Sequence, residues 1–199
     1  MKYLMLTSLF SVAFSIAVSA QPATAAAPVC TNETVAGISS RGIKIGTKLD
    51  EILSIFATNE EQKEKMRRNQ PSAGSKRHLG YEVFSAEPID GGPNGKFEGI
   101  SGYTFTFLDE KLTGFTVRYT KPKWKDGGQF ADTMSGLLSL PKIDPNSGLI
   151  CGDYLIRVYA WQDSSSFNVN DQRLDKIIKE RVEKQNEDQR NADLKKFKP

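Results

Sequence analysis

The sequence YTFTFLDEKLTGFTVRY at residues 103–119 decides the fold of this chain. Aromatic residues alternate with threonine over 103–107, a polar turn follows at 109–111, and a second alternating run extends from Leu112 to Tyr119. Alternation with a period of two is typical of a strand that buries one face, and aromatic and β-branched residues favour strands. The stretch therefore predicts a β-hairpin whose aromatic side chains point into a core.

Further strand patterns lie on both sides of this hairpin. Tyr81–Phe84 predicts a strand before it. After it, Leu149–Trp161 predicts one long strand with two alternating faces, and a serine-rich turn leads into a short strand through Phe167 and Val169. Together these patterns predict an antiparallel sheet of about five strands.

A first amphipathic helix is predicted ahead of the strands. Thr47 stands three residues before Asp50 in a capping-box-like arrangement, which indicates a helix start. Helical spacing places four apolar residues on one face: Leu49, Ile52, Leu53 and Phe56. The charged stretch from 59 to 76 is interpreted as the solvated end of a helix that leads into a loop.

A second amphipathic helix is predicted between the hairpin and the later strands. Asp126 stands three residues before Gln129 and can cap its start, and Pro141 ends it. Its apolar stripe consists of Phe130, Met134, Leu137 and Leu138. The predicted fold class is therefore α+β, with two helices packed on one face of the antiparallel sheet and with the helix-then-strands order occurring twice.

The N-terminal residues have the pattern of a secretory signal peptide. Lys2 precedes an apolar run at 3–18, and mostly small residues follow it. The run is shorter than the roughly 20 residues that span a bilayer, so we expect no transmembrane segment in the mature chain. Cleavage after Ala20 or after Ala25 fits the preferred pattern, and the protein is predicted to be periplasmic or secreted.

The predicted organisation has four parts. They are a signal peptide at 1–20, a lead segment at 21–36, a single α+β domain at 37–170, and a charged C-terminal helix and tail at 171–199. In the last part an apolar stripe ends at Val182, and nearly everything that follows to Asp193 is polar. We expect a helix from 171 to about 190 that docks by its first turns and then projects, as an ordinary amphipathic helix or as a handle for a partner.

The chain has two cysteines, Cys30 and Cys151. In an oxidising compartment such a pair is most simply a disulfide, whereas a catalytic thiolate would need a histidine partner, and the only histidine is His78 in a predicted loop. On the chain-entropy model, a bond that closes so long a loop contributes about 4 to 5 kcal/mol to stability. It would tie the N-terminal segment to the second half of the fold.

Composition narrows the classes of function. Lysines and arginines number 27 against 24 acidic residues, and removal of Lys2 leaves 26 against 24, or +2, which is too balanced for a nucleic-acid-binding surface. One histidine and two cysteines that pair with each other are too few ligands for a zinc site, so we expect no metal and no cofactor. Asn32-Glu33-Thr34 matches an N-glycosylation sequon, which matters only in a host that glycosylates secreted proteins.

The best candidate binding surface combines aromatic and cationic residues. Its members are Lys121, Lys123, Trp124, Lys125 and Trp161. Aromatic rings beside cations suit a sugar, an anionic lipid or an acidic protein surface. The alternative is a strand-to-helix loop whose Trp124 folds back on the core.

The passage GTKLDEI at residues 46–52 resembles bacterial envelope proteins related to β-lactamase inhibitor protein and to the small lipoprotein of the outer-membrane barrel-assembly machine. In those families a similar start opens a helix that packs on an antiparallel sheet, and the inhibitor has two such units. The order of elements over residues 43–169 follows the same scheme. The second unit differs because it starts with Asp-Gly-Gly-Gln at 126–129, and no lipobox precedes Cys30.

Two classes of function remain after these observations. The expected one is a non-catalytic binding or envelope-associated module. It would bind an envelope protein or polymer and act as a monomer. The alternative is a small extracytoplasmic hydrolase that works through paired carboxylates, since a glycosidase needs only two carboxyl groups at a suitable separation. We expect no catalytic residue that the sequence alone can identify.

Overall fold

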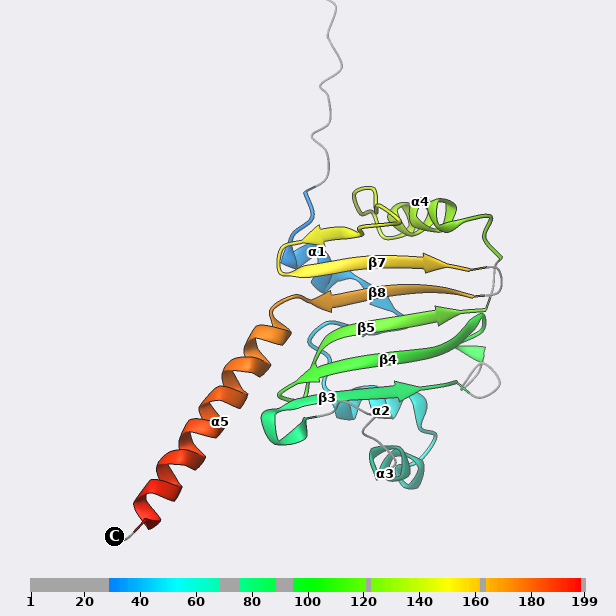
Figure 1. The fold of residues 1–199 in the computed structure, drawn as a ribbon. Helices are drawn as coiled ribbons and strands as arrows, with labels where there is room; N and C mark the ends of the chain where they lie inside the picture. Colours follow the sequence, from blue (N-terminus) through cyan, green and yellow to red (C-terminus); the bar gives the residue numbers. More distant parts are fainter. Residues whose placement is uncertain (1–28, 69–75, 89–94, 121–122, 162–163, 198–199) are drawn as a thin grey trace, which may run out of the picture.

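The structure is a computed structural model of the chain, and it describes residues 29–68, 76–88, 95–120, 123–161 and 164–197 (Figure 1). The predicted signal peptide at 1–20, part of the lead segment and Lys121 lie outside these residues. None of the helices in the described ranges is long and apolar enough to cross a membrane.

A six-stranded antiparallel sheet forms the centre of the structure (Figure 1). Its strands are β3 (Tyr81–Ala86), β4 (Ile100–Leu108), β5 (Lys111–Tyr119), β6 (Leu149–Cys151), β7 (Tyr154–Ala160) and β8 (Ser165–Asp171). Their order across the sheet is β3-β4-β5-β8-β7-β6. Two further strands, β1 (Ser39–Ser40) and β2 (Ile43–Lys44), form a separate small sheet. The predicted α+β class with an antiparallel sheet is confirmed, with one strand more than expected.

The sheet consists of two consecutive three-strand meanders joined along one edge. The strands β3, β4 and β5 form the first meander, β6, β7 and β8 form the second, and the antiparallel pair β5 and β8 joins them. A helix precedes each meander in the chain. The predicted helix-then-strands order is therefore present twice.

The helices of the structure differ in the face they cover. They are α1 (Asn32–Gly37), α2 (Leu49–Phe56), α3 (Glu60–Arg68), a 3-10 helix η1 (Arg77–Leu79), α4 (Gly127–Leu137) and α5 (Leu174–Lys196). The helices α2 and α4 share one core with alternate residues of the strands. They therefore lie on the same face of the sheet, as predicted, while α5 leaves the end of β8 and projects (Figure 1).

Aromatic residues dominate the covered face. Tyr103, Phe105 and Phe107 of β4 are buried, and Phe105 stacks between Tyr103 at 5.3 Å and Phe84 at 6.1 Å between ring centroids. Phe56 of α2 lies over the same cluster, 5.6 Å from Tyr103 and 5.9 Å from Phe105. The predicted core-facing aromatic residues of the hairpin are confirmed, because only one face of these strands is packed against helices.

The stretch at 149–161 corrects the prediction of one long strand. It forms β6 and β7, which pair with each other around Gly152 and Asp153. Gly152 has a φ of 58°, a left-handed conformation that favours glycine and turns the chain. The alternation predicted within β7 is correct, since Tyr154, Ile156 and Val158 are buried.

The structure also corrects three predictions about the helices. The side chain of Thr47 does not cap α2, because its hydroxyl donates to the Lys44 carbonyl at 2.7 Å and Asp50 instead accepts from Lys63 at 2.9 Å. The charged stretch after Asn59 forms α3, a helix of its own, and Lys63 is buried. Leu137 does not belong to the packed stripe of α4, since it is 75% exposed.

Cap formation at α4 agrees with the sequence. The Asp126 carboxylate accepts the backbone N–H of Gln129 at 2.8 Å. The helix ends at Leu137, and Ser139 then adopts a φ of 53° before Pro141. Local signals thus place both ends of this helix correctly.

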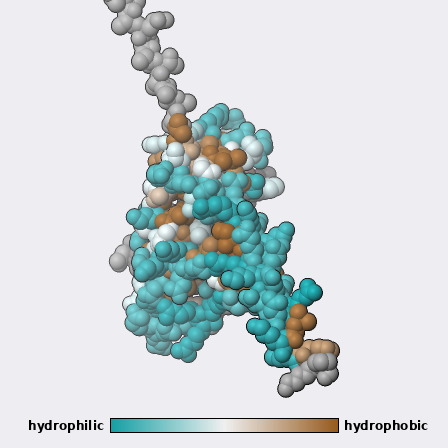
Figure 2. All heavy atoms as spheres, turned by 90° about the vertical axis from the view of Figure 1, so that its left-hand side faces the viewer, coloured by the Kyte–Doolittle hydropathy of each residue, from teal (hydrophilic) through white to brown (hydrophobic). Residues whose placement is uncertain are grey.

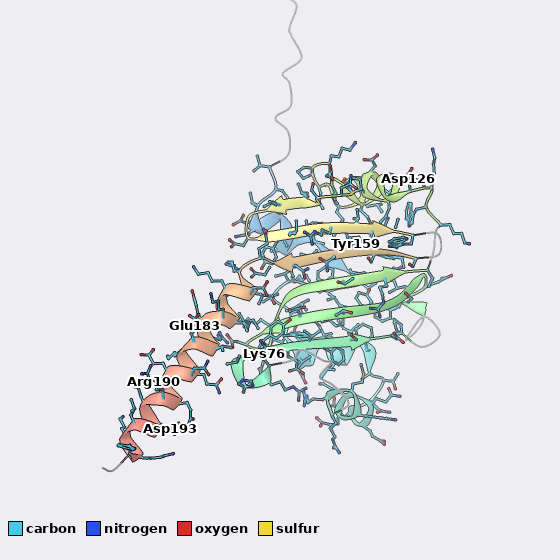
Figure 3. The ribbon with its side chains drawn as sticks, viewed as in Figure 1. Lys76, Asp126, Tyr159, Glu183, Arg190 and Asp193 are labelled. Atoms are coloured by element: carbon cyan, nitrogen blue, oxygen red, sulfur yellow. A yellow bond between two sulfur atoms is a disulfide. The ribbon has the colours of Figure 1, made fainter. Side chains whose placement is uncertain are left out.

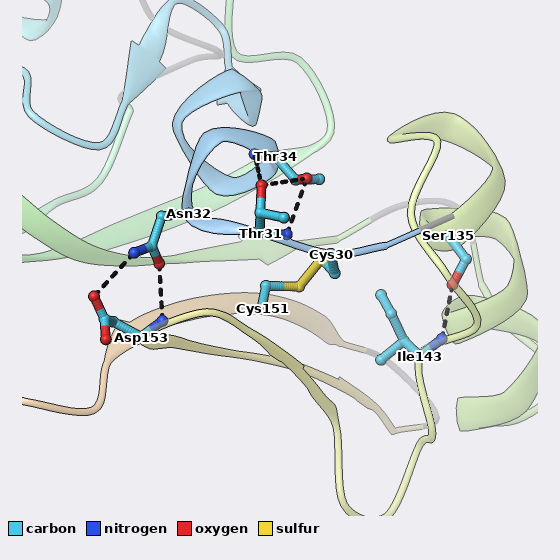
Figure 4. The surroundings of a disulfide bond; sticks show 8 residues. All are labelled: Cys30, Thr31, Asn32, Thr34, Ser135, Ile143, Cys151 and Asp153. Carbon is cyan, nitrogen blue, oxygen red and sulfur yellow. Dashed lines mark hydrogen bonds between the residues drawn. A yellow bond between two sulfur atoms is a disulfide. The ribbon is translucent and has the colours of Figure 1, made fainter. Parts of the chain in front are cut away.

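Cys30 and Cys151 form a disulfide with their Cα atoms 4.6 Å apart (Figure 4). Beside it, Asn32 donates to the Asp153 carboxylate at 2.9 Å and accepts the backbone N–H of Asp153 at 2.8 Å. The disulfide and these hydrogen bonds fix the start of α1 to the β6–β7 hairpin. The sequon at Asn32 therefore has a structural role, because its amide nitrogen already binds Asp153.

Two arginines anchor α5. At its start, the Arg173 guanidinium donates to Asp171 at 2.9 and 2.6 Å and lies 2.8 Å from Asp153. Further along, Arg181 donates two hydrogen bonds of 2.7 Å to Asp109 in the β4–β5 turn. Leu174 and Ile178 are the buried residues of the helix, so its first turns dock as predicted.

The rest of α5 stands away from the body of the protein (Figures 1 and 2). From Glu183 onward every described residue is exposed except the half-buried Ala192. Figure 2 shows this arm as hydrophilic with a small hydrophobic end, where Leu194 and Phe197 are 62% and 76% exposed. The helix continues to Lys196, beyond the predicted end near 190.

Candidate functional site

The face of the sheet that α2 and α4 leave uncovered is lined by polar side chains. Strand register aligns five of them in one row that crosses β3, β4, β5, β8 and β7: Ser85, Thr104, Thr116, Asn168 and Arg157. A second row beside it contains Gly102, Arg118, Ser166 and Tyr159. We call these nine residues the polar face.

Hydrogen bonds hold the middle of the polar face in place. Asn168 donates to the Thr116 hydroxyl at 2.6 Å and accepts from the Asn170 amide at 2.8 Å. The Ser85 and Thr104 hydroxyls lie 3.5 Å apart on the neighbouring strands. Because their mutual contacts fix the rotamers of these side chains, a ligand would meet groups that are already positioned.

Arg118 lies flat on the sheet. Its guanidinium passes directly over Gly102, where a Cβ would collide with it. Nη1 donates to the Thr104 hydroxyl at 3.2 Å, and Nη2 lies 3.5 Å from the Glu87 carboxylate. Gly102 is thus required for the close approach of this side chain, and 39% of the Arg118 side chain remains exposed.

The charge of the polar face has one sign. Its nine residues include two arginines and no carboxylate. Among the ion pairs of the described residues, Arg118 meets one carboxylate, that of Glu87, and Arg157 enters none. Arg157 is exposed at the end of its row. The face therefore presents cationic donors among hydroxyl and amide groups.

Aromatic side chains stand at one end of the polar face. Tyr159 on β7 is 47% exposed (Figure 3), and Trp161, directly after the strand, is 77% exposed. The Trp161 N–H donates to the Ser164 carbonyl at 2.7 Å, so the chain there still follows the hairpin. A period of two places Trp161 on the same side as Tyr159.

The predicted binding surface divides at this point. The side chain of Trp124 folds back toward the core, where its ring centroid is 4.9 Å from that of Phe130 and its indole N–H donates to Ser165 at 3.0 Å. Lys123 and Lys125 are exposed beside it. Because β7 pairs Ala160 with Ser165, the structure brings the Trp124 loop and Trp161 to the same end of the sheet.

Sequence reasoning missed the polar face itself. Its residues occupy the alternate positions of strands whose apolar positions were recognised. That alternation could have assigned them to one face, but it could not align residues from five strands.

A hollow of about 480 Å³ lies at the turn between β4 and β5. Its lining includes the carboxylates of Glu82, Asp109 and Glu110. Glu82 forms an ion pair with Arg77. Asp109 is bound by Arg181, which holds the pKa of that carboxyl below its ordinary value. Arginines therefore bind two of the three carboxylates.

Among the described residues, every carboxyl group whose pKa is displaced has a lowered pKa. The pKa is lowered at Glu33, Asp50, Asp109 and Asp144, and in each case the largest cause is a hydrogen bond to the carboxylate. A general acid needs a raised pKa to stay protonated near neutral pH. These four groups are therefore unsuited to that role. Within the described residues, no three His, Cys, Asp or Glu side chains gather closely enough to hold a metal ion.

Comparison with known proteins found no family model, no curated protein and no solved structure that matches this chain.

Proposed function

We propose that this protein is a non-catalytic binding module that works outside the cytoplasm and holds its ligand on the polar face. The observation that carries the proposal is the row of hydrogen-bonding side chains across five strands, from Ser85 to Arg157. Packing of the core does not require these residues, because they point away from it. A surface of ordered polar groups beside exposed aromatic rings is well suited to recognition.

The proposed location follows from the disulfide and the N-terminal sequence. A bond between Cys30 and Cys151 is typical of proteins from oxidising compartments. The predicted signal peptide points to the same compartments. The resemblance at residues 46–52 adds the proposal of an envelope-associated role, and it is supported by the two helix-plus-meander units.

The carboxylates favour binding over hydrolysis. A glycosidase of the usual kind pairs a protonated carboxyl group with an ionised one. In the hollow near the β4–β5 turn, Glu82 and Asp109 are both bound by arginines. Asp109 and Arg181 form a charged clamp that holds α5, and Glu82 binds Arg77 of η1, so the arrangement does not support an acid and base pair.

Retention of envelope material on the immobilised protein tests the proposal. The protein, purified with its disulfide intact, is incubated with separated polymer and protein fractions of the producing cell's envelope. Asn168→Tyr places a bulky ring in the centre of the polar face. Asn191→Tyr, on the exposed arm of α5, is the matched control. Circular dichroism and thermal melting establish that both variants fold.

The proposal expects one fraction to be retained by the wild type and by Asn191→Tyr, and lost with Asn168→Tyr. Retention that is lost only with Asn191→Tyr would transfer binding to α5 and overturn the assignment to the polar face. Failure of the wild type to retain any fraction would overturn the binding function itself.

A further inference from the structure

We infer that the ligand of the polar face is an acidic polysaccharide, a polymer of sugar rings that carries carboxylate or phosphate groups. The inference rests on the proposed binding function and goes beyond it by naming the ligand chemistry. Three features of the face support it: the sign and spacing of its charges, the hydroxyl and amide groups between them, and the exposed aromatic rings at one end.

The spacing of the two arginines fits a polymer. Arg118 lies on β5 and Arg157 on β7, with β8 between them. Adjacent strands are about 4.8 Å apart, so the two strands that carry the arginines are separated by about 10 Å. The Arg118 guanidinium lies over Gly102 and beside Thr104 of β4, on the side away from β7, so a single small anion bound there is separated from the strand of Arg157 by more than this distance. A chain with repeated anionic groups can contact both guanidinium groups.

Both arginines retain donors for a ligand. The guanidinium group has five N–H donors and matches carboxylate or phosphate oxygens in pairs. The contacts of Arg118 with Thr104 and Glu87 use only some of these donors and fix the plane of the group. Arg157 is exposed and joins no ion pair among the described residues. Arg118 is thus a preorganised contact, and Arg157 is an adaptable one.

The groups between the arginines favour a sugar polymer over an acidic protein. Ser166 and Asn168 lie between them on β8, and Thr116 lies beside Arg118 on β5. Their hydroxyl and amide groups can donate and accept hydrogen bonds with sugar hydroxyls. The centres of protein interfaces are instead enriched in aromatic residues and methionine. The centre of the polar face has neither.

The aromatic end completes the site. The exposed rings of Tyr159 and Trp161 provide flat apolar surfaces with polar edges. The C–H faces of a sugar ring can pack on such a surface while its hydroxyls stay hydrated or bind the neighbouring side chains. Lys125 is exposed beside Trp124, whose indole reaches Ser165 at the same end of the sheet.

Affinity measurements on defined polymers test the inference. Carboxymethyl-dextran and unmodified dextran share one backbone and differ in charge, polygalacturonate supplies a second acidic sugar polymer, and poly-glutamate supplies an acidic polypeptide. The protein should bind the two acidic polysaccharides, with affinity that falls as salt rises because the contacts are ionic. Dextran and poly-glutamate should bind at least about tenfold more weakly.

Variants assign the contacts. Arg118→Gln and Arg157→Gln should each weaken binding of carboxymethyl-dextran about tenfold and reduce its salt dependence. Arg118→Lys should recover part of the loss, because it keeps the charge without the planar fork. Trp161→Ala should weaken binding without changing the salt dependence. Arg190→Gln, on the exposed arm of α5, is the matched control and should bind like the wild type.

Three results would overturn the inference. Equal binding of dextran would remove the role of charge, and equal binding of poly-glutamate would remove the preference for a sugar polymer over an acidic polypeptide. If none of the polysaccharides binds while an envelope fraction is still retained by the wild type and lost with Asn168→Tyr, the ligand chemistry is wrong and the binding function stands.

Discussion

The two faces of the central sheet are built from the same strands and have opposite chemistry. On β4, the buried Tyr103, Phe105 and Phe107 point to the helices, while Thr104 and Thr106 between them point to the other side. The covered face is aromatic and aliphatic, and the polar face contains hydroxyl, amide and guanidinium groups. Burial against α2 and α4 accounts for the first set of residues. It does not account for the second, which is why the function is sought there.

The largest expected effect concerns the disulfide, which attaches the N-terminal segment to the covered side at β6. Replacing both cysteines, Cys30→Ser with Cys151→Ser, should lower the free energy of unfolding by about 5 kcal/mol, because the bond closes a loop of 121 residues. Urea denaturation of the oxidised wild type and the variant measures the difference. A loss below about 1 kcal/mol would mean that the hydrogen bonds of Asn32 and the packing of Val35 hold this segment without the bond.

A pair of neighbouring substitutions compares the two faces directly. Phe105→Ala removes a ring from the aromatic cluster and should cost about 3 to 5 kcal/mol in the free energy of unfolding. Thr104→Ala, one residue earlier on the polar face, should cost about 1 kcal/mol, since only the partly buried hydroxyl contacts with Ser85 and Arg118 are lost. Chemical denaturation measures both. If the two variants lose similar amounts of unfolding free energy, the polar face contributes to stability as the core does, and the distinction between the two faces is wrong.

The clamp between Asp109 and Arg181 gives a smaller, pH-dependent effect. The arginine lowers the pKa of Asp109 in the folded protein, so the pair stabilises the fold above the unfolded pKa of about 4 and ceases to do so as the pH falls through the lowered value. The side chains of Asp109 and Arg181 are 60% and 35% exposed, so solvent screens the pair, and the expected contribution at pH 7 is only about 0.2 to 1 kcal/mol.

Asp109→Asn removes this dependence and provides the measurement. At pH 7 amide hydrogen exchange in the first turns of α5 should be faster in the variant than in the wild type. The difference should shrink as the pH is lowered below about 4. Exchange that is equal at pH 7 would show that Leu174 and Ile178 dock the helix without the clamp.

The smallest effect at neutral pH is expected at Tyr119, at the end of the covered face. Burial raises its pKa to about 12. The folded protein therefore keeps this proton longer than the unfolded chain, and the stabilisation is present below about pH 10 and is lost as the pH rises through the raised value. Absorbance titration of the phenols should show a step near pH 12 that is missing in Tyr119→Phe, while stability at pH 7 changes by less than about 0.5 kcal/mol.

The sequence by itself determined the elements with strong local signals. The alternation at 103–119 predicts the hairpin, and the apolar spacing at 49–56 together with the Asp126 cap predicts the two helices on one face. The two cysteines predict their own bond. These features follow from periodicity, capping and residue inventory, and each depends on residues close together in the chain or on the only available partner.

Only the tertiary structure decided which residues meet. Strand order and register align one row of the polar face: Ser85, Thr104, Thr116, Asn168 and Arg157. The residue pattern within a single strand specifies neither its neighbours in the sheet nor its register with them. The same reason separates the two tryptophans. Trp124 packs against Phe130, donates a hydrogen bond to Ser165 and is half-buried, whereas Trp161 is exposed. The burial of a side chain depends on the residues that pack on it from elsewhere in the chain. The sequence therefore identified candidate aromatic and cationic residues, whereas the pairing of distant strands formed the polar face.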